Sequence, residues 1–267
     1  MFVREKVIKA ILDSGENFMS GEQLSKKLGI SRTAVWKHIN ALREEGYNIE
    51  SVNKKGYRLA EKPDDILSSE NIAYNLPTEF IGKKVIHLDT VGSTNDYAKE
   101  IGNKVSGGTL IISEQQTKGK GRLGRVWKSK SGDGIWMSLI IKPKIEPYKA
   151  PFLTLVAGAS VVKALSNLDV EASIKWPNDI IVHNKKICGI LTELSAEMER
   201  VNYVVIGIGI NIKTIDFPDE IKEKATSLYK EGYKLSRVDI VRQFCIEFEK
   251  LYKGYILDGN SYYIMRA

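Results

Sequence analysis

A loop near the middle of the chain combines cations with glycines. Residues 115–127 contain four cations and three glycines and follow a predicted strand that ends near Ser113. Glycine lets backbone N–H groups approach an anion closely, and lysine and arginine offset the charge of a carboxylate or a polyphosphate. The loop is therefore suited to handling phosphate. The alternative is a solvated basic loop without a ligand, because charged side chains usually face water.

The spacing within this loop bears on two common nucleotide-binding motifs. Gly119, Gly121 and Gly124 satisfy G-x-G-x-x-G, but Trp127 and a polar Lys-Ser run follow, with no helix start to cap a pyrophosphate. A dinucleotide-binding motif is therefore only weakly indicated. A Walker-type phosphate loop is excluded, because the spacing G-x-x-x-x-G-K-[ST] is missing.

Three further motifs accompany the loop in a fixed order. They are Ser-Thr-Asn-Asp at residues 93–96, Lys-Trp-Pro-Asn-Asp at 175–179 with Lys-Ile-Cys-Gly-Ile-Leu at 186–191, and Gly-Ile-Gly-Ile-Asn at 207–211. Together with the basic loop they resemble the biotin-protein ligase family, over residues 1–255. The resemblance implies an α+β chain with an N-terminal winged helix-turn-helix and a mixed-sheet catalytic domain like that of class II aminoacyl-tRNA synthetases. Relatives usually continue into a small β-barrel, which we expect to be absent because the sequence ends at Ala267.

The resemblance also implies an activity. Such enzymes use ATP to activate biotin as biotinyl-5′-AMP and transfer the biotinyl group to a lysine of a biotin carboxyl carrier protein. With a winged helix they also repress biotin genes. We therefore expect biotin, ATP and Mg²⁺ to bind, with the carrier protein, operator DNA and a second copy of the chain as partners. Two alternatives remain open, a regulator that senses biotin without catalysis and a lipoate-type ligase.

Matching the motifs residue by residue gives the expected site. The expected biotin contacts are Ser93, Thr94, Asn95, Gln116, Lys120, Gly121, Arg122 and Lys186. The expected ATP contacts are Arg122, Arg125, Lys186 and Asn211. Lys186 is the main catalytic residue expected, with Arg122, because an ammonium group between the biotin carboxylate and the α-phosphate lowers their repulsion. Asp179 is expected to orient or deprotonate the attacking lysine, whose free pKa is about 10.4. No protein ligand for a metal is expected.

Some of these residues have simpler interpretations. Ser93, with Asp96 three residues later, is also a capping box. Lys186, beside another lysine, also fits a surface side chain that extends into water, and Asn211 also fits a strand-end turn. Many relatives have arginine where this chain has Lys120, and lysine offers a point charge in place of a bidentate fork.

The first sixty residues predict a helix-turn-helix followed by a wing. A 3.6-residue apolar period predicts a helix over residues 3–12, and caps at Ser20 and Ser31 begin two more. A hairpin with a basic tip at residues 53–56 follows. Asn40 is expected to point outward with the expected base contacts Arg32, Thr33 and Lys37; the expected phosphate contacts are Lys54, Lys55 and Arg58. A protein-interaction or purely structural module is the alternative.

The rest of the chain predicts a second, larger domain. Residues 61–65 are polar and contain a proline, so we place the domains at 1–62 and 63–267. Extended apolar segments predict strands at residues 85–88, 109–113, 135–141, 173–176, 180–182, 187–194 and 203–212, and helical periods lie at 95–101, 152–168 and 238–252. Successive strands without intervening helices predict an α+β domain with a mixed or antiparallel sheet.

Composition narrows the class of partner. The formal charge of +7 and the pI near 9.1 favour anionic partners. No apolar run approaches the ~20 residues that span a bilayer, and no secretory signal begins the chain, so we expect a cytoplasmic protein without a membrane partner. Cys188, Cys245 and the scattered histidines lack the spacing of a disulfide framework or a zinc site.

Overall fold

The computed structural model describes residues 3–60, 65–197 and 200–257. The chain divides into two compact units, Met1–Tyr74 and Asn75–Ala267. The domain boundary predicted at residues 62–63 falls in 61–64, outside the described residues, so its position stays a prediction. Each unit has its own buried core.

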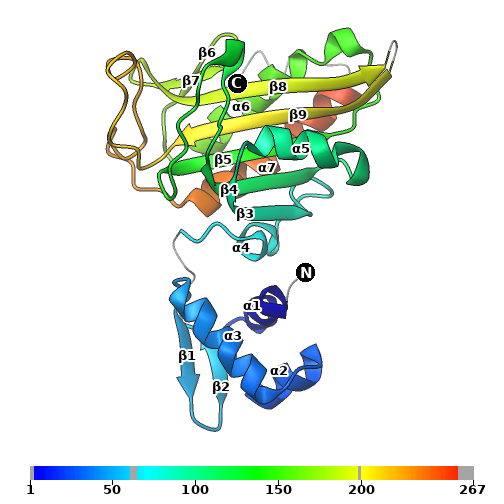
Figure 1. The fold of residues 1–267 in the computed structure, drawn as a ribbon, viewed down its shortest axis with the longest axis vertical. Coiled ribbons are helices and arrows are strands. Elements are labelled where there is room, and N and C mark those ends of the chain that lie inside the picture. Colours follow the sequence, from blue (N-terminus) through cyan, green and yellow to red (C-terminus); the bar gives the residue numbers. More distant parts are fainter. Residues whose placement is uncertain (1–2, 61–64, 198–199, 258–267) are drawn as a thin grey trace. The chain divides into compact units, whose positions relative to one another are not determined.

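Three helices build the first unit, as the caps and apolar periods predict (Figure 1). They are α1 (Val3–Asp13), α2 (Gly21–Leu28) and α3 (Arg32–Glu44). Ser20 and Gln23 form the predicted capping box at the start of α2, and Gly29 ends this helix in the left-handed conformation that glycine adopts without steric cost. Ser31 caps α3 by accepting the N–H of Ala34 at 3.1 Å. The helix-turn-helix is therefore defined by local signals at each helix end.

A hairpin follows α3. Strand β1 (Ile49–Val52) pairs antiparallel with β2 (Gly56–Leu59), which confirms the predicted extended arms. Met19 and Tyr57 exchange backbone hydrogen bonds at 2.9 Å, so the hairpin is joined to the segment before α2. A Cβ at Gly56 would lie 2.2 Å from the Met19 carbonyl oxygen, so only glycine permits this approach. The unit ends with a short helix that the sequence did not predict, α4 (Ser69–Ala73).

A seven-stranded mixed sheet forms the second unit, in the order β3-β4-β5-β9-β8-β7-β6 (Figure 1). The strands are β3 (Val85–Val91), β4 (Thr109–Gln116), β5 (Gly134–Ile141), β6 (Ser173–Lys175), β7 (Asp179–Val182), β8 (Lys185–Glu197) and β9 (Arg200–Asn211). Only β3 and β4 run parallel to each other, and the other neighbours are antiparallel. The predicted mixed sheet is confirmed, with β8 and β9 longer than the apolar runs that predicted them.

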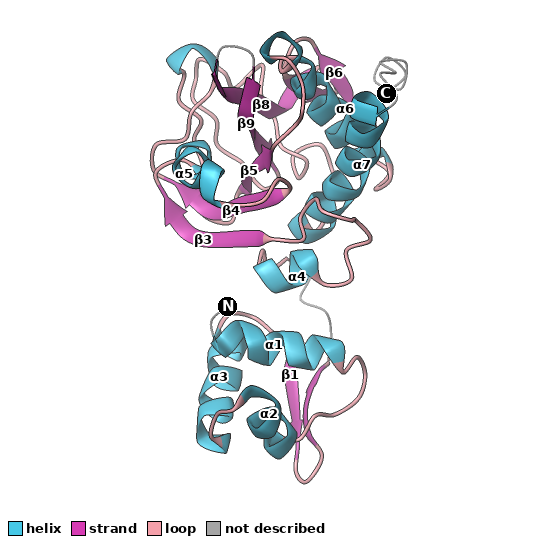
Figure 2. Ribbon diagram, turned by 90° about the vertical axis from the view of Figure 1, so that its right-hand side faces the viewer, coloured by secondary structure: helices cyan, strands magenta, loops and turns pink. Residues whose placement is uncertain are grey.

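Helices cover both faces of this sheet (Figure 2). Helix α5 (Thr94–Ile101) lies on one face, and α6 (Phe152–Ser166) and α7 (Arg237–Leu257) pack together on the other. Short 3-10 turns lie at η1 (Gly102–Lys104), η2 (Arg122–Gly124) and η3 (Pro147–Lys149). The basic loop begins at the end of β4, and the Ser-Thr-Asn-Asp motif begins α5. Gly207 faces Asn95 of α5 and Gly209 faces Trp127 of the loop, so these motifs meet on the face of the sheet that α5 covers.

One helical stretch, Pro147–Ser166, is long and apolar enough to cross a membrane by length and composition alone. The expectation that no apolar run approaches this length is therefore wrong. Most of the stretch is buried, and Leu153, Val156 and Leu165 are fully enclosed between the sheet and α7. Its apolar composition is that of a core helix.

Candidate active site

The basic loop is fastened at its base and folds back on itself. The Lys118 N–H donates to the Gly92 carbonyl oxygen at 2.7 Å, and the Trp127 N–H donates to the Gly119 carbonyl oxygen at 2.9 Å. At the tip, Leu123 is 91% exposed and left-handed, with φ +57°. A non-glycine residue in that region costs about 1–3 kcal/mol. The loop is thus ordered by its own backbone while its tip is presented to solvent.

Two glycines make room for Trp127 on the sheet. Gly189 of β8 and Gly209 of β9 are paired directly, and a Cβ on them would lie 2.8 and 2.5 Å from the Trp127 indole. The ring therefore lies against bare backbone. Its Nε1 is buried without a hydrogen-bond partner among the described residues. A buried N–H group without an acceptor lowers the folding stability by about 1–3 kcal/mol. A ligand that supplies an acceptor for Trp127 Nε1 would remove this penalty.

Lys186 lies under the same ring. Its Nζ is 5.2 Å from the Trp127 ring centroid and 2.7 Å from Asp179 Oδ1. The contact with Asp179 is an ion pair without a hydrogen bond, because Asp179 Oδ1 has no hydrogen-bond partner among the described residues. The Lys186 backbone also donates to Lys224 at 2.8 Å and accepts from Thr226 at 2.9 Å. A lysine held in this way does not fit the interpretation of a side chain extending freely into water.

Lys120 is held by α5. Its Nζ lies 2.6 Å from Asp96 Oδ2, while Asp96 Oδ1 lies 3.1 Å from Lys99, which in turn lies 2.7 Å from Glu193 on β8. Burial alone would raise the pKa of Asp96, but the hydrogen bonds from Lys120 and Lys99 hold it below its usual value. The expected contact of Lys120 with biotin would therefore require this lysine to exchange Asp96 for the ligand.

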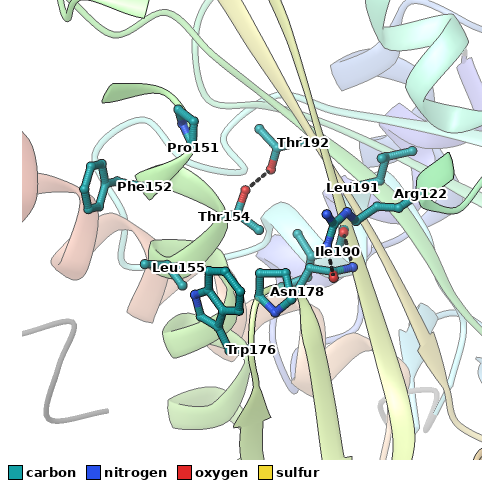
Figure 3. Close-up of a pocket in the computed structure, with 11 residues that line it drawn as sticks. Arg122, Pro151, Phe152, Thr154, Leu155, Trp176, Asn178, Ile190, Leu191 and Thr192 are labelled. Carbon is teal, nitrogen blue, oxygen red and sulfur yellow. Dashed lines mark hydrogen bonds between the residues drawn. The ribbon is translucent and has the colours of Figure 1, made fainter. Parts of the chain in front are cut away.

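Arg122 is held on the opposite side of the loop. Its Nη1 donates to Asn178 Oδ1 at 2.7 Å, and Asn178 donates to the Ile190 carbonyl oxygen at 3.0 Å (Figure 3). Arg122 also borders a pocket of about 440 Å³ between α6 and β8. The other lining residues are Pro151, Phe152, Thr154, Leu155, Trp176, Pro177, Asn178, Ile190, Leu191 and Thr192. Of the expected site residues only Arg122 lines this pocket, so the pocket adjoins the predicted site and does not coincide with it.

The start of α5 is linked to the base of the loop. Ser93 caps the helix by accepting the Asp96 N–H at 3.4 Å, whereas the Asp96 carboxylate turns to lysines and does not complete a capping box. Gln116 Oε1 accepts from the backbone and hydroxyl of Thr94 at 2.8 and 3.1 Å. Gln116 Nε2 donates to Ser129 at 2.8 Å. In this arrangement the Ser93 hydroxyl group can still donate a hydrogen bond to a ligand, whereas the side-chain amide of Gln116 already forms hydrogen bonds within the protein.

Asn95 is fully engaged inside the fold. Its Nδ2 donates to the Leu191 carbonyl oxygen at 3.2 Å and to Glu193 Oε2 at 2.8 Å, and its Oδ1 lies 2.6 Å from Ser138 Oγ. A Cβ at Gly207 would lie 2.2 Å from Asn95 Oδ1. The geometry therefore favours a structural role for Asn95 over the expected contact with biotin, because both of its N–H donors are used.

The remaining expected contacts are divided. The Asn211 side chain is buried and donates to the Thr226 carbonyl oxygen at 3.1 Å, which fits the strand-end interpretation. The Gly121 N–H donates to the Arg125 carbonyl oxygen at 2.7 Å. The Arg125 side chain is exposed. The structure thus brings Lys186, Asp179, Arg122 and the loop together, and it leaves the others at the margin.

On the first unit, the expected DNA contacts are unequally available. Arg32, Thr33 and Lys37 are exposed on α3, and Lys54 and Lys55 are exposed at the hairpin tip. Arg58 instead lies 2.6 Å from Glu50 and stacks 4.6 Å from the Phe18 ring centroid. Asn40 does not point freely outward as expected, because it is partly buried and accepts from Arg43 at 3.3 Å.

Sequence reasoning misses several residues that the structure brings to these sites. Trp127 belongs to the basic loop and Asn178 to one of the motifs, but the sequence pattern assigns a role to neither. Ser138, which joins Thr94 and Asn95 at 2.7 and 2.6 Å, carries no signal at all in the sequence. A tryptophan placed opposite a pair of glycines is the signal that could have found Trp127.

Known proteins share both units of the chain. Residues 88–211 match the Biotin/lipoate A/B protein ligase family, and residues 3–58 match the HTH domain. Over 96% of its length, the chain is 46% identical to the bifunctional ligase/repressor BirA of Bacillus spizizenii, of which it covers 80%. The chain belongs to the bifunctional biotin ligase/repressor family.

More distant members agree with this assignment. The bifunctional ligase/repressor BirA of Escherichia coli is 32% identical over 96% of the chain and 79% of that protein. The biotin protein ligase from Aquifex aeolicus, solved in complex with biotin and ATP, has a TM-score of 0.58 at 36% identity and covers 66% of this chain and 72% of that one. Membership of the bifunctional biotin ligase/repressor family confirms the predicted class of enzyme and the predicted fold. The roles of single residues stay predictions.

Proposed function

We propose that the chain is an ATP-dependent ligase that activates biotin as biotinyl-5′-AMP, transfers the biotinyl group to a lysine of a biotin carboxyl carrier protein, and represses biotin genes by binding operator DNA. One observation supports the enzymatic part. The basic loop and Lys186 come together over the part of the sheet where Gly189 and Gly209 are paired. Trp127 of the loop lies on Gly189 and Gly209, with Lys186 Nζ 5.2 Å from its ring centroid.

In the proposed first step, a carboxylate oxygen of biotin attacks the α-phosphorus of ATP. The new P–O bond forms the mixed anhydride, the bond between the α-phosphorus and the bridging oxygen breaks, and pyrophosphate leaves. Two anions must approach each other, so a cation between them lowers the barrier more than it tightens ground-state binding. Lys186 is proposed for that position, and Arg122, held at 2.7 Å by Asn178, for the phosphate side.

In the proposed second step, the carrier lysine nitrogen attacks the biotinyl carbonyl carbon and AMP leaves. The nitrogen forms an amide and must lose the protons of an ammonium group whose free pKa is about 10.4. Asp179 is proposed to orient this amine and receive a proton. Its distance of 2.7 Å from Lys186 supports the role, because it keeps a carboxylate beside the reacting acyl group.

Mg²⁺ is proposed to arrive bound to the phosphates of ATP, where this ion usually keeps several waters. Within residues 3–60, 65–197 and 200–257, no group of three or more His, Cys, Asp or Glu side chains could hold a metal ion. We propose no protein ligand for the ion, because Mg²⁺ needs only one or two protein carboxylates beside the phosphates.

DNA binding is proposed for the helix-turn-helix unit, with Arg32, Thr33 and Lys37 toward bases and Lys54 and Lys55 toward phosphates. The exposure of these side chains supports the assignment. Arg58 is proposed as a weaker phosphate contact, because Glu50 already offsets its charge. We further propose a cytoplasmic homodimer without a membrane partner.

The decisive experiment is to incubate the full chain with ATP, Mg²⁺, biotin and an acidic carrier domain, and to weigh the products. We expect the carrier to gain one biotinyl group, and biotin to drive exchange of labelled pyrophosphate into ATP. Neither product forming would identify a regulator that only senses biotin. Transfer of lipoate in preference to biotin would identify a lipoate-type ligase.

A further inference from the structure

An exposed tryptophan lies on the outer face of the helix that is proposed to read DNA. Val35, Ile39 and Leu42 bury one side of α3, at 0%, 0% and 2% exposure. Because these positions follow the helical period, they fix which way the rest of the helix points. Trp36, adjacent to Val35 and about 100° from it around the helix axis, is 53% exposed.

The neighbours of Trp36 define a short outer strip. Thr33 and Lys37 are exposed one turn before and beside it, and neither forms a hydrogen bond or ion pair with another described residue. The far half of α3 is occupied differently. Arg43 donates to the Ile49 carbonyl oxygen at 2.9 and 2.8 Å and to Ser51 at 2.8 Å, so it fastens the hairpin. The first two turns of α3 therefore carry the exposed Thr33, Trp36 and Lys37, whereas Arg43 near its end is engaged with the hairpin.

The Trp36 indole makes no polar, aromatic or cation contact within the described part of the unit. Among the described residues of this unit, Val3, 38% exposed, is the only other large apolar side chain that is exposed. Single exposed apolar side chains are common on protein surfaces, so the partner is indicated by the place of Trp36 on the helix that is proposed to enter DNA.

The charge around Trp36 identifies the chemistry of that partner. Lysine and arginine beside the indole favour an anionic surface, while the indole itself favours an apolar patch within it. In the major groove of DNA the apolar group is the 5-methyl of thymine, since the other edges present hydrogen-bonding atoms. We propose that Trp36 is a specificity-determining residue that packs on a thymine methyl group in each half of the operator. The inference rests on the proposed DNA binding and adds the base that is read.

The test can begin without a known operator sequence. Duplexes are selected from a randomised pool by the full chain, with biotin, ATP and Mg²⁺ present, and in parallel by Trp36→Ala and Trp36→Phe. Each thymine in the selected duplex is then replaced by deoxyuridine, which removes only the methyl group. Val3→Ala is the matched control, because it trims an exposed apolar side chain from α1.

We expect the wild-type chain to lose about fourfold in affinity when the contacted thymine of one half-site becomes deoxyuridine, which is the effect of burying about one methyl group. Trp36→Ala should bind about tenfold more weakly and respond equally to thymine and deoxyuridine at that position. Trp36→Phe should retain the preference, and Val3→Ala should behave as wild type. If the melting temperature and the rate of biotin transfer of the Trp36 variants equal those of wild type, any loss of DNA affinity comes from the DNA contact and not from misfolding.

Three outcomes would overturn the inference. Trp36→Ala could select the same sequences with the same affinity, which would assign the indole to another partner. It could lose affinity for all sequences equally, which would indicate a backbone contact. It could also keep the preference for thymine over deoxyuridine, which would assign that methyl to another residue. If the wild-type chain enriches no sequence, the proposed repressor function fails first, and the pool distinguishes that case.

Discussion

The lysines expected to contact anionic partners are ion-paired in one unit and unpaired in the other. In the ligase unit, Lys186 and Lys120 lie 2.7 and 2.6 Å from the carboxylates of Asp179 and Asp96. In the helix-turn-helix unit, Lys37 and Lys54 are exposed and form no ion pair with any other described side chain. Both regions face anionic partners, yet Lys37 and Lys54 are left unpaired, although Arg58 of the same unit pairs with Glu50 at 2.6 Å.

The difference follows from what each partner demands. A reacting carboxylate and α-phosphate must meet in one geometry, and cations fixed beforehand need not be ordered during the reaction. DNA offers a row of phosphates, and its binding is driven by the release of counterions, for which free cations suffice. The paired Lys186 and Lys120 therefore suit a fixed transition state, and the unpaired Lys37 and Lys54 suit a polyanion.

The largest expected effect comes from removing the central paired cation. Lys186→Met should lower biotin-dependent pyrophosphate exchange by about 10²- to 10³-fold, the usual effect of losing one group that stabilises transition-state charge. The control is Lys185→Met, which removes the adjacent exposed lysine. Equal losses in both variants would contradict a special role for the paired lysine.

The partner of that lysine should matter in the second step more than in the first. Asp179→Asn should slow transfer from preformed biotinyl-5′-AMP to the carrier by about 10²-fold, the lower end of the range for general-base contributions. Single-turnover transfer is the measurement, with pyrophosphate exchange followed in parallel. Transfer at the wild-type rate would exclude Asp179 as the group that receives the proton.

For the unpaired cations, the expected signature is salt dependence. Lys54→Gln should reduce the slope of log affinity against log salt by about one unit, without changing the selected sequence. Filter binding between low and moderate salt measures the slope, and Lys9→Gln on the exposed side of α1 serves as control. A slope that stays the same would mean that the hairpin tip does not meet the phosphates.

The smallest effect is expected at the outer ion pair. Asp96→Asn should lower the dissociation rate of biotinyl-5′-AMP about two- to threefold, because Lys120 no longer has to leave Asp96 for the ligand and an exposed pair contributes little. Because the pKa of folded Asp96 is lowered, the pair persists at neutral pH and is lost as pH falls through that lowered value. Dissociation from wild type should therefore slow at acidic pH, and the variant should lack that change; Asp89→Asn is the control.

How much the sequence foretells depends on whether a signal is local. Caps at Ser20 and Ser31 and the alternating apolar runs are local, and the helices and strands that they predict are present. Helix α4 has only five residues and no apolar period, so the sequence does not reveal it. The pairing of Lys120 with Asp96 joins residues far apart in the chain, and no spacing rule predicts it. The motif match predicts which residues form the site, while the partners of each side chain required the fold.

The glycine pair under Trp127 also limits how the site can be re-engineered. Where Gly189 pairs with Gly209, the surface of the sheet consists of peptide backbone. The pairing of the two strands keeps this backbone from moving away to enlarge the space above it. Substitution there can only add atoms and shrink the space. If biotin binds at this part of the sheet as proposed, room for a bulkier analogue would have to come from a smaller side chain in place of Trp127, because the glycines beneath it have no side chain to remove.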